Sequence, residues 1–351
     1  MRVKPDVDQL VERRERPDPL LGERPAEALS RLVGAGKADR CGRERCQICV
    51  GLARNPLERR QAVGGLFERV GHEPNLQCRG MRTAIAIGAG AAAAGAVAWG
   101  HFEAGWVRLE ELECPLERLS PELAGVRIAH LSDFHLGFPS RGEQAVRSAV
   151  DWVSTRKPDL VLVSGDLLSR RQGEPLLREL LARLPNCLAV LGNHDFAETN
   201  DPFSTRSPVG DLEPATLLLD EAKTVGVRGR NVQIVGVDPR SYRRGLAQPA
   251  RLADPRADLR ILLCHFPNVI DRLPKGAFDL VLAGHLHAGQ ITLPLPGWRI
   301  PLAHPRWHYI HGLYRRNGAT LHVSAGLGTT FVPFRFLARP EATELLLVES
   351  T

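Results

Sequence analysis

Short apolar runs alternate with polar segments along the chain from Val126 onward. Within each run the apolar side chains occupy neighbouring positions rather than every second one, which is typical of strands covered on both faces. The runs lie in VRIAHLSD, DLVLVSGD, CLAVLGNHD, LRILLCHFP, FDLVLAGHLH and TLHVSAGLG. The pattern therefore predicts a series of buried strands.

Helical periodicity fills several of the gaps between these runs. Residues 143–157 place five apolar side chains on one face of a helix: Ala145, Val146, Ala149, Val150 and Val153. PLLRELLARLP predicts a second helix and residues 269–273 a short third one, while KTVGVRG, VQIVGVD and residues 341–349 predict further strands. Strands that alternate with helices in this way predict a layered α/β fold.

Residues 1–80 show no sustained period. They are rich in Arg, Pro and Glu and poor in aromatic residues, which predicts a disordered N-terminal extension. The spacing of Cys41, Cys46 and Cys49 is compatible with a metal site, but a solvated basic segment is the favoured interpretation. The extension holds 16 of the 46 Lys and Arg residues and 12 of the 40 Asp and Glu residues. The rest of the chain is therefore nearly neutral and offers no basic face for nucleic acid.

Residues 81–102, MRTAIAIGAGAAAAGAVAWGHF, form an apolar segment with a short basic start. An A-x-A sequence at residues 96–98 completes the parts of a secretory signal, and Met81 is an alternative start of translation that would leave residues 1–80 untranslated. The uncharged run is also about long enough to cross a bilayer, which takes roughly 20 residues. A cleaved signal, a retained anchor and a soluble Ala-rich helix are the alternatives, and we favour membrane targeting. Arginines before the segment and EELECPLE after it favour an extracytoplasmic position for the rest of the chain.

Residues that can bind metal ions follow five of the predicted strands. The set comprises Asp133, His135, Asp166, Asn193, His194, His265, His285 and His287. Polar residues after a single strand are more often part of a turn than of a binding site. In an open α/β sheet, however, the carboxyl ends of the strands share one edge, where ligands bind. Carboxylates, an amide oxygen and imidazoles suit Mn, Fe or Zn. The sequence therefore predicts a metal site at this edge.

The spacing of His285 and His287 further suggests two ions. On an extended backbone, side chains at i and i+2 point the same way, roughly 6.5–7 Å apart. In dinuclear centres the ions lie about 3.5–4 Å apart, so neighbouring histidines can bind different ions. Nucleophile motifs with Ser or Cys and phosphate-binding loops are absent, since GLGTTF lacks the Lys of a P-loop. Hydrolysis by metal-bound hydroxide is the mechanism that these residues favour.

The order D-x-H, G-D, G-N-H-D, H, G-H-x-H resembles the calcineurin-like metallophosphoesterase superfamily over about residues 126–349. The resemblance implies a β-sandwich flanked by helices, in a domain covering residues 103–351, with a dinuclear site at the C-terminal strand ends and manganese as the favoured metal. It implies that Asp166 bridges the ions, that His194 protonates the leaving oxygen and that Asp195 orients His194. The remaining ligands would be Asp133, His135 and His287 for the first ion and Asn193, His265 and His285 for the second.

Departures from the sequence patterns of particular subfamilies narrow the choice of subfamily. No tyrosine follows Asp166 closely, which argues against an iron–tyrosinate centre, and GDLLSRR places Arg170 where it could contact phosphate. The apolar segment and the C-terminal sequence resemble bacterial membrane-associated members, which include enzymes that cleave the pyrophosphate of UDP-diacylglucosamine. This implies an inner-membrane protein with a lipid-linked substrate. A soluble nucleotide phosphodiesterase and a non-catalytic binding module are the alternatives.

Residues 331–337, FVPFRFL, hold three of the eleven phenylalanines around one arginine. They form either an edge strand with inward phenylalanines or a membrane-contacting segment. In the second case the rings would accept acyl chains and Arg335 would meet a phosphate or headgroup.

Overall fold

The computed structural model describes residues 76–207, 209–295, 298–303 and 307–350. The predicted disorder and the cysteine spacing of the N-terminal extension fall almost wholly outside these residues. The chain divides into one unit of Met1–Gly80 and a second of Met81–Thr351, and the second carries all the strands described below.

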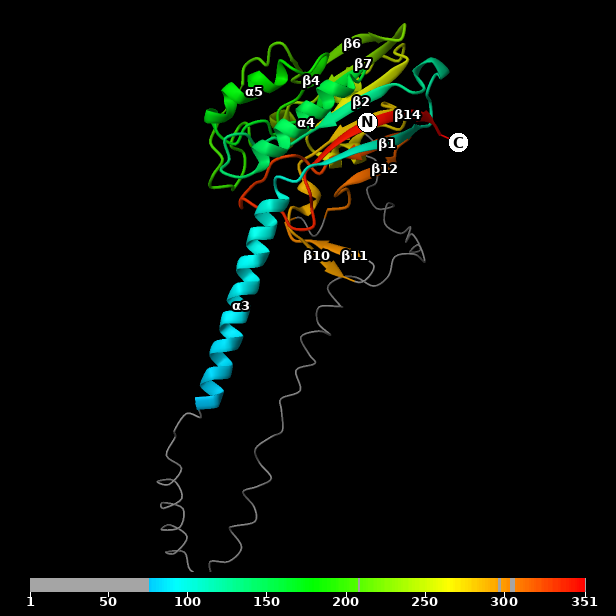
Figure 1. The fold of residues 1–351 in the computed structure, drawn as a ribbon. Coiled ribbons are helices and arrows are strands. Elements are labelled where there is room, and N and C mark those ends of the chain that lie inside the picture. Colours follow the sequence, from blue (N-terminus) through cyan, green and yellow to red (C-terminus); the bar gives the residue numbers. More distant parts are fainter. Residues whose placement is uncertain (1–75, 208, 296–297, 304–306, 351) are drawn as a thin grey trace, which may run out of the picture. The chain divides into compact units, whose positions relative to one another are not determined.

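Two six-stranded sheets form the centre of the second unit (Figure 1). The first has the order β1 (Arg108–Leu116), β14 (Glu341–Glu349), β2 (Arg127–Leu131), β3 (Leu160–Val163), β4 (Cys187–Ala189), β5 (Thr216–Leu217). The second has the order β12 (Gly312–Arg316), β13 (Ala319–Val323), β9 (Leu280–Ala283), β8 (Leu259–Leu263), β7 (Arg230–Gly236), β6 (Glu221–Val227). The runs β2–β5 and β7–β8–β9–β13 are parallel, so each sheet gathers several carboxyl ends at one edge.

The core lies in three layers. Ile128 and Leu162 of the first sheet pack with Ile234 and Ile261 of the second in one buried cluster between the sheets. A second cluster fills the space between the first sheet and the helices α4 (Gly142–Arg156) and α5 (Glu174–Leu181). A third covers the other face of the second sheet, where the 3-10 helix η4 (Pro267–Arg272) packs. This confirms the predicted layered α/β fold, and the apolar face predicted for residues 143–157 is buried as a whole.

The remaining elements are short. They are η1 (Pro121–Leu123), η2 (Arg171–Gly173), α6 (Pro239–Arg243), η3 (Pro249–Arg251), η5 (His287–Gly289) and the hairpin β10 (Thr292–Leu295) with β11 (Trp298–Pro301). The third predicted helix is therefore a 3-10 helix, with Pro267 at its start. Residues 331–337 form a loop with one isolated bridge from Phe336 to Ile291, so the predicted edge strand is wrong.

The helix α3 (Leu76–Glu103) contains the apolar segment. Among the described residues it supplies one helix, Thr83–Glu103, that is long and apolar enough to cross a membrane, with a mean hydropathy of 1.5 and little burial. The last turn of α3 is bonded to the loop 331–337, since the amide of Arg335 donates to the carbonyl of Gly100 (3.0 Å).

Candidate metal centre

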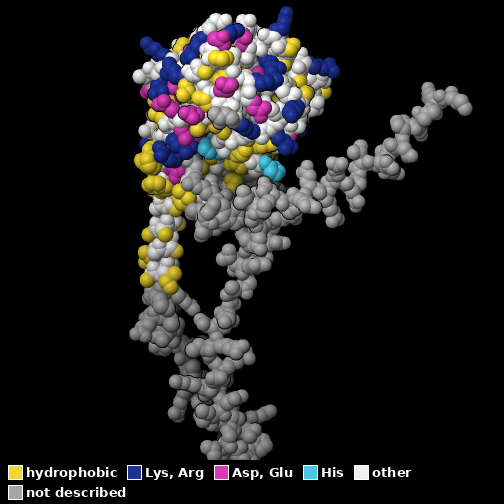
Figure 2. All heavy atoms as spheres, turned by 90° about the vertical axis from the view of Figure 1, so that its right-hand side faces the viewer, with side chains coloured by type: hydrophobic (Ala, Val, Ile, Leu, Met, Phe, Trp, Pro, Cys, Tyr) yellow, Lys and Arg dark blue, Asp and Glu magenta, His cyan; other side chains and the backbone are white. Residues whose placement is uncertain are grey.

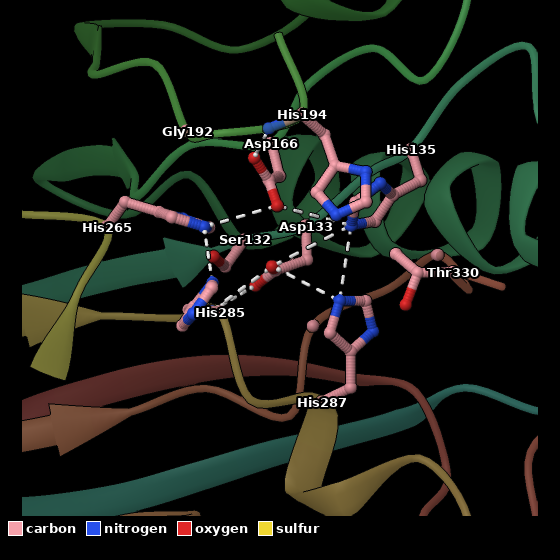
Figure 3. A network of polar contacts seen from close by, with 12 residues as sticks. Ser132, Asp133, His135, Asp166, Gly192, His194, His265, His285, His287 and Thr330 are labelled. Atoms are coloured by element: carbon pink, nitrogen blue, oxygen red, sulfur yellow. Dashed lines mark hydrogen bonds and ion pairs between the residues drawn. The ribbon is translucent and has the colours of Figure 1, made fainter. Parts of the chain in front are cut away.

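Five loops bring the predicted ligands together (Figure 3). The first sheet contributes the residues that follow β2, β3 and β4, and the second sheet contributes those that follow β8 and β9. All are buried except His285, which is half-buried. The site therefore lies where the two sheets meet at their carboxyl ends, as parallel strand topology requires.

One group of three side chains comprises Asp133, His135 and His287, whose ligand atoms all lie within 4.8 Å of one another. Nε2 of His287 is 3.1 Å from Nε2 of His135 and 3.4 Å from a carboxylate oxygen of Asp133. Two imidazole nitrogens that face each other beside a carboxylate form a donor set for a divalent cation. We call this group the first triad.

The second triad comprises Asp166, His265 and His285, again within 4.8 Å of one another. Nε2 of His265 is 3.1 Å from Nδ1 of His285 and 3.2 Å from the carboxylate of Asp166. The amide oxygen of Asn193 lies 3.2 Å from the same Nε2. The other nitrogen of His265 faces the carbonyl oxygen of Ser164 at 2.9 Å, an arrangement that commonly orients a metal-binding imidazole.

Asp166 lies between the two triads. Its Oδ2 is 3.2 Å from Nε2 of His265 in the second triad and 3.5 Å from Nε2 of His135 in the first. Its Oδ1 accepts the backbone amide of His194 at 2.8 Å, which fixes the carboxylate. A Cβ on Gly192 would overlap this carboxylate, so the glycine allows the close approach. The donor set therefore fits two divalent ions, with Asp166 placed to bind both.

The charges in the site favour cations. Burial alone would raise the pKa of Asp133, but His287 and His135 hold it well below its usual value. Burial lowers the pKa of His287 to about 4, so this ring is neutral at neutral pH. Burial would also lower the pKa of His265, yet the charge and hydrogen bond of Asp166, the charge of Asp133 and the carbonyl of Ser164 together outweigh it and raise the pKa to about 9. Without metal the second triad thus carries a proton that an ion must displace.

The backbone around the triads takes unusual conformations. Asp133, His135, Asp166, His285 and His287 all have positive φ values, between 47° and 76°. Residues other than glycine seldom adopt positive φ values, and the residues that do are concentrated at functional sites. The extended backbone that we expected for His285 and His287 is therefore wrong, although the two rings do lie in different triads.

His194 faces the triads without belonging to either. Its ring lies edge-on to His135, with centroids 4.7 Å apart, and burial lowers its pKa to about 4. Its Nδ1 is 3.1 Å from the hydroxyl of Ser204 and 3.8 Å from the carboxylate of Asp201. The orienting partners are therefore Ser204 and Asp201, which sequence reasoning missed because no motif marks them.

The prediction that Asp195 orients His194 is wrong. The carboxylate of Asp195 is fully buried and accepts backbone amides of Gly192 and Leu168 (both 2.8 Å) and Leu167 (3.3 Å). It joins the loops that follow β3 and β4. Burial, with the nearby charge of Asp166, raises its pKa to about 7.

The prediction that Arg335 meets a phosphate or headgroup is also wrong. This side chain is fully buried, and its guanidinium donates to the carbonyls of Gly328, Ala325, Ala338 and Gly326 at 2.6–3.1 Å. Its Nη2 also lies 3.1 Å from Nδ1 of His287. Arg335 therefore contacts His287 of the first triad and binds together the loop carbonyls around it.

Arg170 is half-buried and donates to the carbonyl oxygen of Phe203 at 2.8 Å. It is not among the described residues that line the cleft at the triads. A phosphate contact by Arg170 stays a prediction.

A cleft of about 600 Å³ opens over the triads. His194, His285 and His287 form part of its wall, and Arg243, Arg272, Asn268, Phe266 and Trp307 form another part. A second cavity of about 430 Å³, with mostly apolar walls, lies beside it and is lined by Leu286, Ile291, Leu302 and Val332. His287, Thr330 and Phe331 line both. The cleft over the triads is called the polar arm of the site below, and the apolar cavity beside it is called the apolar arm.

Comparison with known proteins gives consistent matches. Residues 126–289 match the family model of the calcineurin-like phosphoesterases. The chain is 30% identical over 271 residues to an uncharacterized metallophosphoesterase of Helicobacter pylori, which covers 71% of this chain and 67% of that protein. It is 31% identical over 264 residues to a transmembrane protein with metallophosphoesterase domain from Danio rerio, covering 69% and 58%. It is 26% identical over 256 residues to phosphodiesterase YaeI of Escherichia coli, covering 71% and 91%.

Proposed function

We propose that the chain, which belongs to the calcineurin-like metallophosphoesterase family, hydrolyses a phosphodiester or pyrophosphate bond in a lipid-linked substrate. The observation that carries the hydrolytic part is the pair of triads joined by Asp166. Two bound divalent ions would supply Lewis acidity for the phosphoryl oxygens and a water of lowered pKa. Manganese is the metal we propose, since oxygen and imidazole donors suit it.

The chain's own residues would do the following work. The triads hold the ions, with Asn193 as a further ligand of the second ion. His194 lies at the edge of the cleft, where it can donate a proton to the leaving oxygen. Its pKa of about 4 leaves it neutral without substrate, and a phosphate dianion or monoanion beside it would favour the protonated ring. Ser204 and Asp201 hold the ring in place at Nδ1.

Three observations support a lipid-linked substrate at the inner membrane. The helix α3 is a candidate span. The apolar cavity adjoins His287 and is large enough to receive part of an acyl chain. The relative from Danio rerio carries the word transmembrane in its name. The flanking charges support an extracytoplasmic catalytic part.

A soluble phosphodiester, such as a nucleotide derivative, is the second candidate. The polar arm supports it, because Arg243 and Arg272 can meet anionic groups and Phe266 stacks on Tyr242 with centroids 4.8 Å apart beside them. The name of YaeI, a phosphodiesterase, is compatible with either candidate.

The experiment compares three substrates with the chelator-stripped protein reloaded with Mn²⁺. Bis(p-nitrophenyl) phosphate tests for hydrolase activity as such. UDP-diacylglucosamine and its deacylated counterpart, both in detergent, test for the lipid. We expect hydrolysis of the first, and faster hydrolysis of the acylated than of the deacylated compound. Equal rates for the last two would favour the soluble phosphodiester, and no metal-dependent hydrolysis of any would contradict the hydrolase itself.

A further inference from the structure

The exposed apolar side chains of the described residues are unevenly distributed. Nine of the twelve large ones lie on α3, just after it, on the β10–β11 hairpin and its flank, or on the loop 331–337: Ile85, Ile87, Val97, Trp99, Phe102, Trp106, Leu293, Leu302 and Phe331. Figure 2 shows hydrophobic side chains along α3 and where it joins the globular part. Such a concentration indicates an interaction site rather than ordinary surface.

The end of α3 carries an aromatic cluster. Trp99, Phe102 and Trp106 contact one another, with centroids 5.7–6.3 Å apart, and each is between 44% and 46% exposed. The guanidinium of Arg339 stacks on Trp106 at 3.8 Å, and that of Arg141 lies 5.7 Å from Phe102. Half-exposed aromatic rings next to arginines, at the end of an apolar helix, are typical of the headgroup layer of a bilayer.

Hydrogen bonds attach this cluster to the loop 331–337. The amide of Arg335 donates to the carbonyl of Gly100, and the amide of Ala338 donates to the buried carboxylate of Glu103 at 2.8 Å. The same carboxylate accepts the indole N–H of Trp99 at 3.0 Å. The aromatic cluster therefore has a defined position relative to the loop.

The other side of the loop is attached to the hairpin. The amide of Phe336 donates to the carbonyl of Gln290, and the amide of Thr292 donates to the carbonyl of Phe336 (both 2.9 Å). The side chain of Gln290 bonds both backbone groups of Thr330. Figure 1 shows the hairpin on the same side of the sheets as the end of α3. The exposed Leu293, Leu302 and Phe331 thus belong to one surface with the aromatic cluster.

We propose that this surface rests on a lipid bilayer, so that both arms of the site open at the level of the headgroups. Its continuity with the apolar helix α3, which is long and apolar enough to cross a membrane, argues for a bilayer as the occupant. His287 of the first triad lines the apolar cavity that Leu302 and Phe331 border, so the docked surface brings the metal centre next to the lipid. The inference rests on the proposed action on a lipid-linked phosphoester, and it makes the bilayer part of substrate presentation.

The test uses the full chain, loaded with Mn²⁺, in phosphatidylcholine–phosphatidylglycerol vesicles. Two diesters with the same leaving group are compared: bis(p-nitrophenyl) phosphate in solution and hexadecyl p-nitrophenyl phosphate in the vesicles. The double variant Trp106→Asp/Leu293→Asp places charges on the surface. Leu246→Asp is the matched control, because Leu246 is exposed and belongs to neither α3, the hairpin nor the loop.

We expect the double variant to lose about tenfold or more on the vesicle diester, since two partly exposed apolar side chains no longer enter the lipid. Its rate on the soluble diester should stay within about twofold of the wild-type rate, and the control should match wild type on both. Equal effects on both diesters, or none on either, would overturn the docking surface. Wild type that cleaves only the soluble diester would instead contradict the lipid-linked substrate, and no cleavage at all would contradict the hydrolase.

Tryptophan fluorescence tests the surface without activity. Lipids brominated near the headgroup should quench the wild-type protein more than lipids brominated near the chain end. That difference should shrink in Trp99→Phe/Trp106→Phe, because these rings supply it. Equal quenching by both lipids, or an unchanged difference in the variant, would place the rings outside the headgroup layer and overturn the proposal.

Discussion

At the scale of single residues, His194 and Asp195 are neighbours in the chain whose side chains enter separate networks. The imidazole faces the cleft and is held by Ser204 and Asp201, while the carboxylate accepts backbone amides behind the site. This geometry, with His194 outside both triads, supports the proposed role of His194 as a proton donor.

His194→Ala should therefore keep both ions and slow turnover by on the order of 10²–10⁴, the usual contribution of a general acid. The loss should be smallest for leaving groups that need little protonation. Metal content together with rates on a series of aryl phosphodiesters checks this. A variant that loses an ion would make His194 a ligand.

Arg335 acts on the site indirectly, through the carbonyls that it joins around His287. Arg335→Lys should weaken binding of the first ion by about 10–100-fold, because a lysine cannot supply the same fork of donors and supporting contacts influence metal affinity to that extent. Calorimetric titration with Mn²⁺ measures it, with Arg339→Lys as the control, since Arg339 stacks on Trp106 away from the triads. Unchanged binding of both ions by Arg335→Lys would show that Arg335 does not support metal binding.

His265 predicts how metal binding depends on pH. Its raised pKa of about 9 means that the metal-free protein holds this proton at pH 7, so an entering ion must displace it. We expect release of about one proton per chain at pH 7, and an affinity that rises as pH rises towards 9. Titrations in two buffers of different ionisation enthalpy measure the release, and identical apparent enthalpies would contradict it.

The residue types and their order predicted which side chains gather in the site, because short loops after parallel strands leave them little freedom. Arg335 could not be predicted in the same way. A charged residue among phenylalanines usually lies at the surface, and only the folded loop shows that its own carbonyls satisfy the guanidinium.

At the scale of elements, the contact between α3 and the loop 331–337 links the apolar helix to the part of the chain that carries the triads. Gly100 allows it, because a Cβ there would lie 2.9 Å from the carbonyl oxygen of Arg335 and 3.2 Å from Cβ of Phe334. The helix cannot pack this closely with a larger residue at that position.

Gly100→Ala should loosen this contact at a cost of about 1–3 kcal/mol, as overpacked sites do. Hydrogen exchange at the amides of Arg335 and Ala338 should then be faster. Gly95→Ala is the control, since a Cβ at that position of the same helix meets nothing within 4 Å. Equal exchange in both variants would show that α3 does not hold the loop.

The sequence predicted the buried strands, but two elements at or beyond the sheet edges, β1 and the β10–β11 hairpin, were missed. The strand β1 was missed because it pairs only with β14 and alternates exposed and partly buried residues over most of its length, so it has no continuous apolar run. The hairpin was missed for a related reason: its two strands pair only with each other and stand outside both sheets.

At the scale of the whole molecule, each triad draws residues from both sheets. Asp133 and His135 follow a strand of the first sheet while their partner His287 follows a strand of the second, and Asp166 is likewise joined by His265 and His285. Bound ions would therefore connect the two sheets and stabilise the fold by about 2.7 kcal/mol per ion at a hundred times the dissociation constant.

Metal content and turnover of Asp166→Asn show whether two ions share this carboxylate. We expect two ions per chain in wild type and in the control Asp201→Asn, whose carboxylate lies near His194 instead. In Asp166→Asn we expect loss of both ions at micromolar metal and a larger loss of phosphodiester turnover than any other single ligand change causes, because the bridging charge serves both sites. Two bound ions with near-normal turnover in Asp166→Asn would contradict the sharing of Asp166.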